Sequence, residues 1–397
     1  MMQISPETQL FIREHSSDDV RVLALQAKKY PDIDMPTAIT QIAGRKVAAE
    51  KIPSWWEIEK IWYPKHLSLE QCSSEITARY KARLLQGDSL TDLTGGFGID
   101  CSFLATGFKS ATYVERQEEL CEIAAHNFPV LNLNHINIKN EDGVTYLQAM
   151  SPVDCLFLDP ARRNEHGGKT VAISDCEPNV AELEELLLQK ANRVMIKLSP
   201  MLDLSLALKE LKQTQEVHIL SVNNECKELL ILLGQTSPAE ISIHCVNLFT
   251  KGTQKEQHFV FTREQEQCSE CTYTDSLETY LYEPNASLLK AGAFRSIAAA
   301  YPVRKLHPNS HLYTSDTFIG NFPGRIFRIV NQCSSNKKES KECLADPKKA
   351  NITIRNFPAT VAELRKRIKL SEGGDTYLFA STLNNEQKVL IRCEKIK

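Results

Sequence analysis

A regular alternation of short apolar runs and helix-like segments over residues 88–235 most constrains the fold. Five of the apolar runs are each followed by a segment with helical periodicity. Strands separated in this way run parallel and are joined by right-handed crossovers. The last two runs, EVHILSV and KELLILLG, are joined by the short link NNEC. Because so short a link cannot cross a sheet, these two strands must pair antiparallel. We therefore predict an α/β, doubly wound, seven-stranded sheet that ends in an antiparallel hairpin.

The segments on either side of this sheet define the other domains. Residues 1–85 have helical periodicity, and one helix is predicted over residues 68–87. The sheet with its helices takes residues 86–240. Residues 241–325 contain two strand-like runs, EISIHCVNLF and QHFVFTRE, which we expect to form one more hairpin, and then a helical stretch, NASLLKAGAFRSIAAAY. Residues 326–397 form the last domain. After a polar link, residues 351–397 show the order strand, helix, strand, strand, which predicts a compact α+β module.

Charge is distributed unevenly along the 397 residues. The whole chain carries a net charge of −3, but residues 326–397 contain 15 Lys and Arg against 8 Asp and Glu, a net charge of +7. The rest of the chain is therefore acidic. A basic domain on an acidic body is typical of proteins that bind a polyanion. A solvated, lysine-rich surface would have the same composition, and the sequence leaves both interpretations open.

Composition and cysteine usage indicate the class of protein. With 42% hydrophobic and 24% charged residues, the chain can bury a sizeable core. No apolar run approaches the roughly 20 residues that span a bilayer, and the segment MMQISPETQLFIREHSSDD lacks the pattern of a signal peptide. The 12 cysteines are scattered singly apart from Cys268 and Cys271, and no second pair stands at zinc spacing. We expect a cytoplasmic protein with no membrane span and no bound metal.

A glycine-rich turn follows the first strand of the sheet, in the segment TDLTGGFGID over residues 91–100. The glycines of this turn are Gly95, Gly96 and Gly98. Glycines here let the backbone pass close to a ligand, and the following helix offers its N-terminal N–H groups. A dinucleotide-binding turn would have a further glycine where this chain has Cys101, which argues against an NAD-dependent dehydrogenase. The acids Asp92 and Asp100 suit a ligand with a cationic amino acid better than a pyrophosphate.

Acidic residues also close the next three strands. Glu115 ends the second strand, where an acid can accept both hydroxyls of a ribose; an ordinary surface acid would stand there equally well. Asp142 and Gly143 follow the third strand, either beside an adenine amino group or as a common Asp-Gly turn. Asp159 follows the fourth strand. Because ligands of open α/β sheets bind at the carboxyl ends of the strands, we predict that these acids and the glycine turn form one site.

These features together resemble class I, Rossmann-like, S-adenosylmethionine-dependent methyltransferases. Within that superfamily, the chain resembles the RNA methyltransferase family with a C-terminal THUMP-like domain. The closer resemblance is carried by the glycine turn and by three further segments: QCSSE at residues 71–75, DPAR at residues 159–162 and KLSP at residues 197–200. The resemblance implies S-adenosyl-L-methionine as the cofactor, a small ferredoxin-like domain around the stretch NASLLKAGAFRSIAAAY, and a basic THUMP-like domain over residues 326–397.

The resemblance also implies catalytic roles for Asp159, Pro160 and Arg162. Related enzymes that methylate exocyclic nitrogens have Asp or Asn, two prolines and an aromatic residue here, and the acid with the first proline's carbonyl accepts hydrogen bonds from the target amine. Arg162 stands in place of the stacking aromatic residue, and an arginine can stack on a base or grip a phosphate. Arg162 and Arg163 are therefore predicted to hold substrate, with structural ion pairs as the alternative. Enzymes that methylate uracil carbon 5 need a nearby cysteine after the fifth strand, and KLSP offers none.

Five other positions receive predicted roles from the resemblance. Ser73 and Ser74 would bind the carboxylate of the cofactor, or else cap a helix. Lys197 would contact substrate phosphate or the cofactor carboxylate, or else extend from the strand end to solvent. Arg365 and Lys366, on the helix of the basic domain, would hold RNA phosphates.

The sequence thus favours a methyltransferase that acts on structured RNA, tRNA or rRNA, at a base nitrogen. The partner would be RNA, and the oligomeric state is not predicted. Two other functions remain open at this point. One is a methyltransferase of a protein or small molecule with the same cofactor. The other is a non-catalytic RNA-binding protein that retains the fold.

Overall fold

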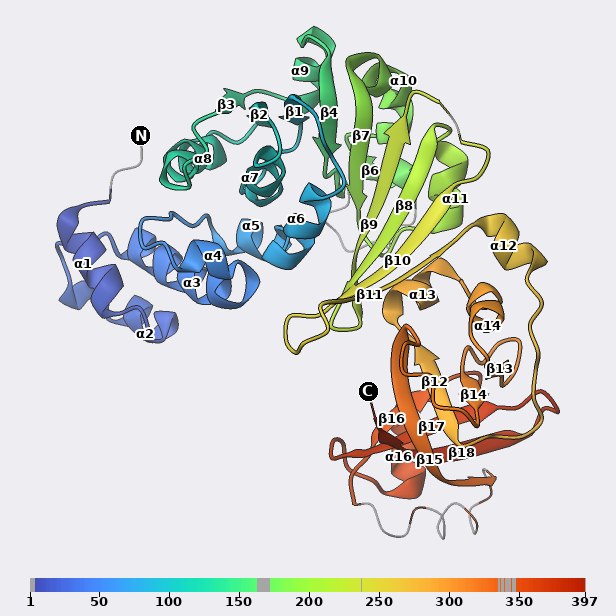
Figure 1. The fold of residues 1–397 in the computed structure, drawn as a ribbon. Helices are drawn as coiled ribbons and strands as arrows, with labels where there is room; N and C mark the ends of the chain where they lie inside the picture. The colour runs from blue at the N-terminus through green and yellow to red at the C-terminus, as the bar shows by residue number, and fades with distance from the viewer. Residues whose placement is uncertain are drawn as a thin grey trace. The chain divides into compact units, whose positions relative to one another are not determined.

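The computed structural model describes residues 4–162, 172–236, 238–334, 336, 339, 344 and 348–396 (Figure 1). The chain divides into two compact units. The first comprises Met1–Glu216 with Leu229–Pro238, and the second comprises Val217–Glu228 with Ala239–Lys397. Among the described residues, no helix is both long enough and apolar enough to cross a membrane.

Helices make up the N-terminal part, as predicted. They are α1 (Pro6–Glu14), α2 (Val20–Leu25), the 3-10 turn η1 (Ala27–Lys29), α3 (Met35–Lys51), α4 (Pro53–Trp56), α5 (His66–Gln71) and α6 (Glu75–Ala82). The single helix predicted over residues 68–87 is wrong, because α5 and α6 are separated at Cys72 and Ser74, whose backbones are extended. Serine side chains compete with helical backbone hydrogen bonds, and the Ser73 hydroxyl donates to Asp100 instead.

The large sheet has the strand order β11-β10-β8-β9-β7-β4-β1-β2-β3. Its strands are β1 (Ser89–Asp92), β2 (Ser110–Glu115), β3 (Ile136–Asn140), β4 (Val153–Leu158), β7 (Ala191–Leu198), β8 (Thr214–Val222), β9 (Glu225–Gly234), β10 (Ser242–Leu248) and β11 (Glu256–Phe261). Strands β3, β2, β1, β4 and β7 run parallel, and β9 pairs antiparallel with β7. The predicted doubly wound sheet with a terminal antiparallel hairpin is confirmed.

The sheet extends beyond the seven strands that the sequence predicts. Strands β10 and β11 form the antiparallel hairpin expected within residues 241–325, but they join the large sheet beside β8. The predicted boundary at residue 240 therefore cuts through the sheet. The reason is physical: β8 would otherwise be an exposed edge strand with unpaired backbone groups, and pairing with β10 satisfies them.

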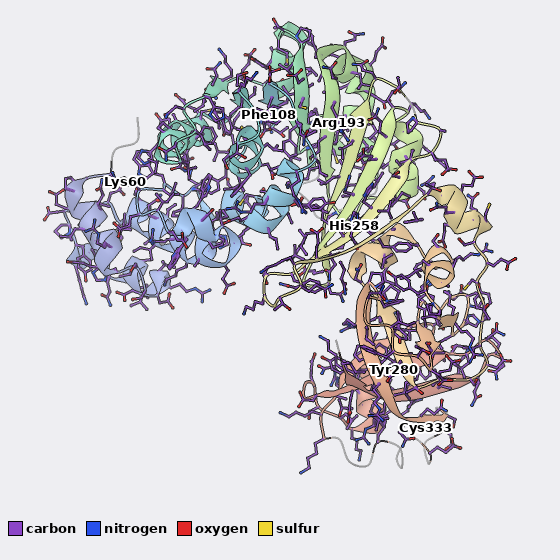
Figure 2. All side chains as sticks on the ribbon, viewed as in Figure 1. Lys60, Phe108, Arg193, His258, Tyr280 and Cys333 are labelled. Atoms are coloured by element: carbon purple, nitrogen blue, oxygen red, sulfur yellow. The ribbon has the colours of Figure 1, made fainter. Side chains whose placement is uncertain are left out.

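Helices and two shorter strands connect the strands of the large sheet. The connecting elements are α7 (Ile99–Ala105), α8 (Glu118–Val130), α9 (Gly143–Ala149), η2 (Ile173–Asp175), α10 (Val180–Lys190) and α11 (Leu204–Glu210), with the two-stranded sheet of β5 (Ala161–Arg162) and β6 (Cys176–Glu177). Phe108, labelled in Figure 2, is buried where α7 leads into β2. Every helix that the sequence predicts between these strands is present.

A second sheet, in the second unit, has the order β13-β14-β12-β15-β18-β17-β16. Its elements are α12 (Arg263–Cys268), β12 (Tyr280–Pro284), α13 (Ala286–Ala291), α14 (Ser296–Ala300), β13 (Arg304–Lys305), β14 (Tyr313–Ser315), β15 (Gly324–Ser334), β16 (Asn351–Ile354), α16 (Val361–Ile368), β17 (Thr376–Thr382) and β18 (Lys388–Lys395). The predicted helical stretch NASLLKAGAFRSIAAAY is two helices, because Gly292 takes a left-handed conformation with φ 78° and ends α13.

The predicted order strand, helix, strand, strand is confirmed in the C-terminal domain. Strand β16 pairs parallel with β17, as a crossover through α16 requires, and β17 pairs antiparallel with β18. The long strand β15 pairs with β12 on one side and β18 on the other. The last domain therefore shares one continuous sheet with the preceding residues.

Gly143 allows the start of α9 to lie against the end of β1. A Cβ atom at this position would stand 2.2 Å from the carbonyl oxygen of Leu93. The oxygen belongs to the backbone and cannot rotate away, so we expect Gly143→Ala to lower the free energy of unfolding by about 1–3 kcal/mol. Gly107→Ala is the matched control, because its Cβ would meet nothing nearer than Leu104 O at 3.7 Å. Urea unfolding followed by tryptophan fluorescence compares the two, and equal midpoints would contradict the close packing.

Candidate active site

Backbone hydrogen bonds hold the glycine turn between the carboxyl ends of the central strands. Leu93 N donates to Phe157 O of β4 at 3.0 Å, and Gly95 N donates to Val114 O of β2 at 2.9 Å. Asp159 N, just after β4, donates to the Thr94 hydroxyl at 2.6 Å. The turn after β1 is therefore fixed to both neighbouring strands, where the sequence predicts a binding site.

Glu115 organises the turn through both of its carboxylate oxygens. Oε2 accepts from Gly96 N at 2.9 Å, and Oε1 accepts from Gln117 N at 2.8 Å. Glu115 as a whole exposes 9% of its surface. Each carboxylate oxygen has a second lone pair, so these backbone contacts leave capacity for ligand hydroxyls.

Glycine is favoured at the positions of this turn for different physical reasons. A Cβ at Gly95 would stand 2.2 Å from the ring of Tyr113, so this position must be glycine for packing. Gly96 has φ +54° and Gly98 has φ +86°, backbone conformations that favour glycine. A Cβ at Gly96 would meet nothing nearer than Thr94 O at 3.8 Å. The backbone of Gly96 is therefore approachable from that side by a ligand.

Asp92 is the most deeply buried acid of the site. It is 1% exposed, and its Oδ1 accepts from Thr94 N at 3.0 Å. Its Oδ2 is buried without a hydrogen-bond partner in the part of the chain that the structure describes. Burial raises the pKa of Asp92 well above its usual value, and the nearby carboxylates of Asp100, Asp159 and Glu115 raise it further. A ligand ammonium group would satisfy Oδ2 and relieve this charge repulsion.

Asp142 has the role of a helix cap in the structure. Its Oδ1 accepts from Val144 N and Thr145 N, both at 3.0 Å, at the start of α9. The turn chemistry that the sequence leaves open is thus present, and a contact of Asp142 or Gly143 with adenine stays a prediction.

Lys81 and Asp100 form a buried ion pair behind the glycine turn. Lys81 Nζ lies 2.8 Å from Asp100 Oδ1, and the Lys81 side chain has no exposed surface. Ser73 bridges them, because its hydroxyl donates to Asp100 Oδ2 at 2.7 Å and accepts from Lys81 Nζ at 2.7 Å. Burial alone would raise the pKa of Asp100, but Lys81 and Lys197 more than reverse this and hold the pKa below its usual value.

Sequence reasoning missed Lys81. The signal that identifies it is its place on α6, three residues after the buried Ala78 and on the face that packs inward. A lysine on the apolar face of a helix needs a buried partner, and Asp100 at the start of α7 is that partner. Asp100 therefore has a structural partner as well as the flanking position that the sequence predicts.

Lys197 is the last residue but one of β7 and lies beside the acid of the DPAR segment. Its ammonium forms a close ion pair with Asp159 Oδ2 and lies 3.8 Å from Asp100 Oδ2. Lys197 is 8% exposed, so it does not extend to solvent. A contact with phosphate or with the cofactor carboxylate stays a prediction, and it would have to share the ammonium with these acids. Although part of the Asp159 side chain is exposed, desolvation by the surrounding protein raises the pKa of this acid, and Lys197 opposes that rise.

The contacts of the remaining residues do not test the roles predicted for them. Pro160 is buried. Arg162 pairs with Cys176 across the small β5–β6 sheet. Arg163 lies outside the described residues. Ser74 precedes α6 but makes no side-chain cap, and its hydroxyl lies 3.2 Å from the Thr77 hydroxyl. The basic residues Arg365 and Lys366 lie on α16, in the second unit. Their roles stay predictions.

Comparison with known proteins assigns the chain to a family. A crystal structure described as a “putative methyltransferase” from Porphyromonas gingivalis W83 is 34% identical over 100% of both chains, with a TM-score of 0.88. This chain belongs to that methyltransferase family. Family models match a ferredoxin-like domain at residues 280–323 and a THUMP-like domain at residues 324–395. No curated protein matches the chain at a significant level.

Two more distant solved structures share less with this methyltransferase. An rRNA methylase from Streptococcus thermophilus is 15% identical over 40% of this chain and 93% of its own, with a TM-score of 0.30. A “putative methyltransferase” from Streptococcus mutans in complex with SAH is 13% identical over 40% of this chain and 96% of its own, with a TM-score of 0.30. Scores this low support no argument about the site.

The buried ion pair predicts a strong effect of Lys81 on stability. Replacing Lys81 by methionine leaves Asp100 buried with one cation fewer, so we expect Lys81→Met to lower the free energy of unfolding by about 3–5 kcal/mol. Lys109→Met is the matched control, because Lys109 pairs with Asp88 at 2.9 Å on the surface, where both side chains are exposed. The control should lose only about 0–1 kcal/mol. Urea unfolding measures both, and similar losses would show that the buried pair contributes no more than a surface pair.

Proposed function

We propose that this methyltransferase uses S-adenosylmethionine to methylate structured RNA, tRNA or rRNA, at a base nitrogen. The observation that carries the cofactor assignment is the set of groups at the carboxyl ends of β1 and β2. These groups are the buried Oδ2 of Asp92, which has no hydrogen-bond partner among the described residues, the approachable backbone of Gly96 and the turn-bound carboxylate of Glu115. Such a set suits a ligand that has an ammonium group, a ribose and no pyrophosphate.

Each of these groups would hold one part of the cofactor. Asp92 would take its ammonium group, Gly96 would lie along the adenosyl moiety, and Glu115 would accept from the ribose hydroxyls. Gly143, with Asp142 as the cap of α9, would face the adenine. The bound cofactor supplies an electrophilic methyl group on a sulfonium. The protein's task is then to align a nucleophile with that methyl group, because in-line transfer depends mainly on positioning.

Asp159 is the residue best placed to receive the nucleophile. Its side chain exposes 36% of its surface, whereas that of its partner Lys197 exposes 10%. An incoming amine can therefore reach Asp159 while Lys197 stays buried behind it. The Asp159 carboxylate would accept a hydrogen bond from the amine, and Pro160 would fix the backbone so that its own carbonyl accepts a second. Lys197 would keep the carboxylate oriented.

The C-terminal domain supports RNA as the substrate. The THUMP-like match covers residues 324–395, and residues 326–397 carry a net charge of +7. Arg365 and Lys366 lie in the last turn of α16, and Lys366 is exposed. Contacts of this kind neutralise phosphates without reading a base sequence. Structured RNA would be held by this domain, and the site at Asp159 would take one of its bases.

Binding of the cofactor should depend on Glu115. We expect Glu115→Gln, which keeps the shape of the side chain but removes its charge, to weaken S-adenosylmethionine binding by about 1.5–3 kcal/mol, which is roughly tenfold or more. Glu119→Ala is the control, because Glu119 is an exposed residue on α8 that pairs with Lys65. Isothermal titration with S-adenosylmethionine and with its demethylated product measures both variants. Binding of neither compound to the unmodified protein would rule out the cofactor assignment.

Methyl transfer should depend on Asp159. We expect Asp159→Asn to bind the cofactor normally but to lower the rate of methyl transfer to RNA by roughly a hundredfold or more. Asp34→Asn is the control, because Asp34 caps α3 and asparagine caps a helix equally well. The assay follows tritium from labelled cofactor into total RNA of cells that lack the gene. A protein that binds the cofactor but labels no RNA would disprove the RNA substrate and leave the cofactor assignment standing.

A further inference from the structure

A glutamate and three histidines gather on strands β8, β10 and β11 of the large sheet. Glu216 and His218 are two residues apart on β8, so their side chains lie on the same face of the sheet. His244 is on β10, the neighbour of β8, and His258 is on β11, the neighbour of β10. None of these four residues has a predicted role in binding the cofactor or RNA.

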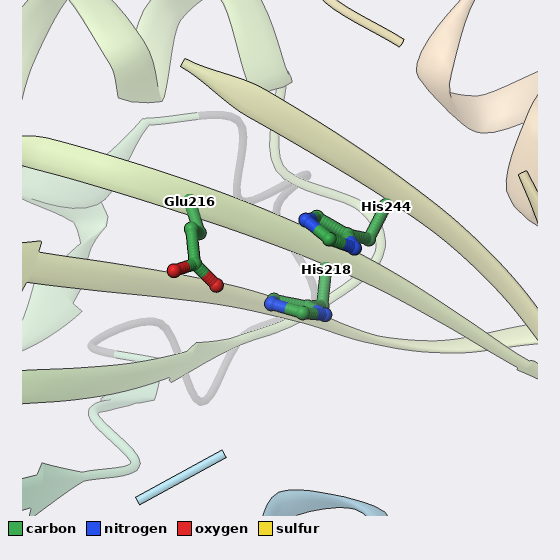
Figure 3. A group of neighbouring side chains, drawn as sticks. All are labelled: Glu216, His218 and His244. Carbon is green, nitrogen blue, oxygen red and sulfur yellow. The ribbon is translucent and has the colours of Figure 1, made fainter. Parts of the chain in front are cut away.

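The side chains of this cluster are close enough to share one ion. The possible ligand atoms of Glu216, His218 and His244 all lie within 4.8 Å of one another (Figure 3). The imidazole rings of His218 and His244 stack with their centroids 4.3 Å apart and their planes at 19°. The ligand atoms of a tetrahedral zinc site are about 3.4 Å apart, given metal–ligand distances of about 2.1 Å. To bind one ion, the two rings would have to turn out of their stacked arrangement, so that a nitrogen lone pair of each points at the ion.

We propose that Glu216, His218 and His244 bind a divalent transition-metal ion, with Zn²⁺ as the expected occupant. Two imidazole nitrogens and one carboxylate oxygen are ligands that zinc accepts, and thiolates are not needed. His218 is 2% exposed and His244 is half-buried, so part of the site is shielded from water. The ion would fasten β10 to β8 and keep a fourth position for water.

Neighbouring contacts orient two of the three ligands as metal sites require. His244 Nδ1 lies 3.1 Å from His258 Nε2, and a proton on His244 Nδ1 would place the lone pair of its ring on Nε2. Arg193 Nη2 donates to Glu216 Oε1 at 2.8 Å, which helps to orient this carboxylate. Hydrogen bonds from outside the coordination sphere generally fix the tautomer and orientation of metal ligands in this way. His258 and Arg193 are therefore positioning residues of the proposed site.

The pattern in the sequence explains why this site escapes motif reasoning. Glu216 and His218 are two residues apart on one strand, but His244 follows His218 by 26 residues, on a strand whose place in the sheet only the fold reveals. No metal is predicted from the sequence, in which Cys268 and Cys271 are the one close pair of cysteines. Histidines on neighbouring strands can also stack without a metal, and metal titration distinguishes these two cases.

Metal titration of the full-length protein tests the proposal. Protein freed of metal with a chelator is titrated with Zn²⁺ by calorimetry and with Co²⁺ by visible absorption. We expect about one ion per chain, a Co²⁺ spectrum of nitrogen and oxygen ligands without thiolate charge transfer, and a rise in Tm on adding Zn²⁺. His244→Ala and His244→Phe should each weaken binding roughly tenfold or more and abolish the rise in Tm. The phenylalanine variant keeps a stacked ring and so separates ligation from packing.

Two controls make the outcome decisive. His66→Ala removes an exposed histidine outside the cluster and should bind zinc like the unmodified protein. The double variant Cys268→Ser, Cys271→Ser removes the close cysteine pair and should also bind normally. Absence of binding, binding that survives both His244 variants, or binding that is lost in the cysteine variant would each overturn the proposal. Metal binding and Tm are measured without methyl transfer, so the outcome does not depend on the proposed function.

Discussion

The buried ion pair between Lys81 and Asp100 is the interaction on which the rest of the candidate site depends. It joins α6, from the N-terminal helical part, to α7, the helix that begins at the glycine turn. A buried charge without its partner is strongly unfavourable, so the pair favours one fixed contact between the two helices. Through Ser73 and Lys197 the same network reaches the QCSSE segment and the end of β7. Segments far apart in the chain are therefore held at one end of the sheet.

This network also explains how so many acids can share one small region. Asp92, Asp100, Glu115 and Asp159 would repel one another if all were ionised without compensation. Lys81 and Lys197 neutralise Asp100 and Asp159, and backbone N–H groups stabilise Glu115. No cation among the described residues pairs with Asp92, and its pKa is raised. The site thus keeps one acid whose charge a cationic ligand would stabilise, which is the electrostatic basis of the proposed cofactor.

Local signals predicted much of the fold because neighbouring residues determine it. The alternation of apolar runs and helices, and the short link NNEC, were enough to predict the parallel sheet and its antiparallel end. The chain alone could not predict that β10 and β11 join the same sheet, because strand pairing over long separations leaves no local pattern. The helix break at Ser73 depends on its distant partner Asp100. The break at Gly292 depends on a left-handed backbone.

The sequence by itself determined which acids and glycines stand at the strand ends, because the carboxyl ends of parallel strands always meet at one edge. Only the tertiary structure decided the partners of those residues. It placed Lys81 against Asp100 and Lys197 against Asp159, and it brought His244 beside His218. The reason is that a strand end is a property of the local chain, whereas an ion pair or a ligand cluster depends on side chains that packing brings together from distant segments.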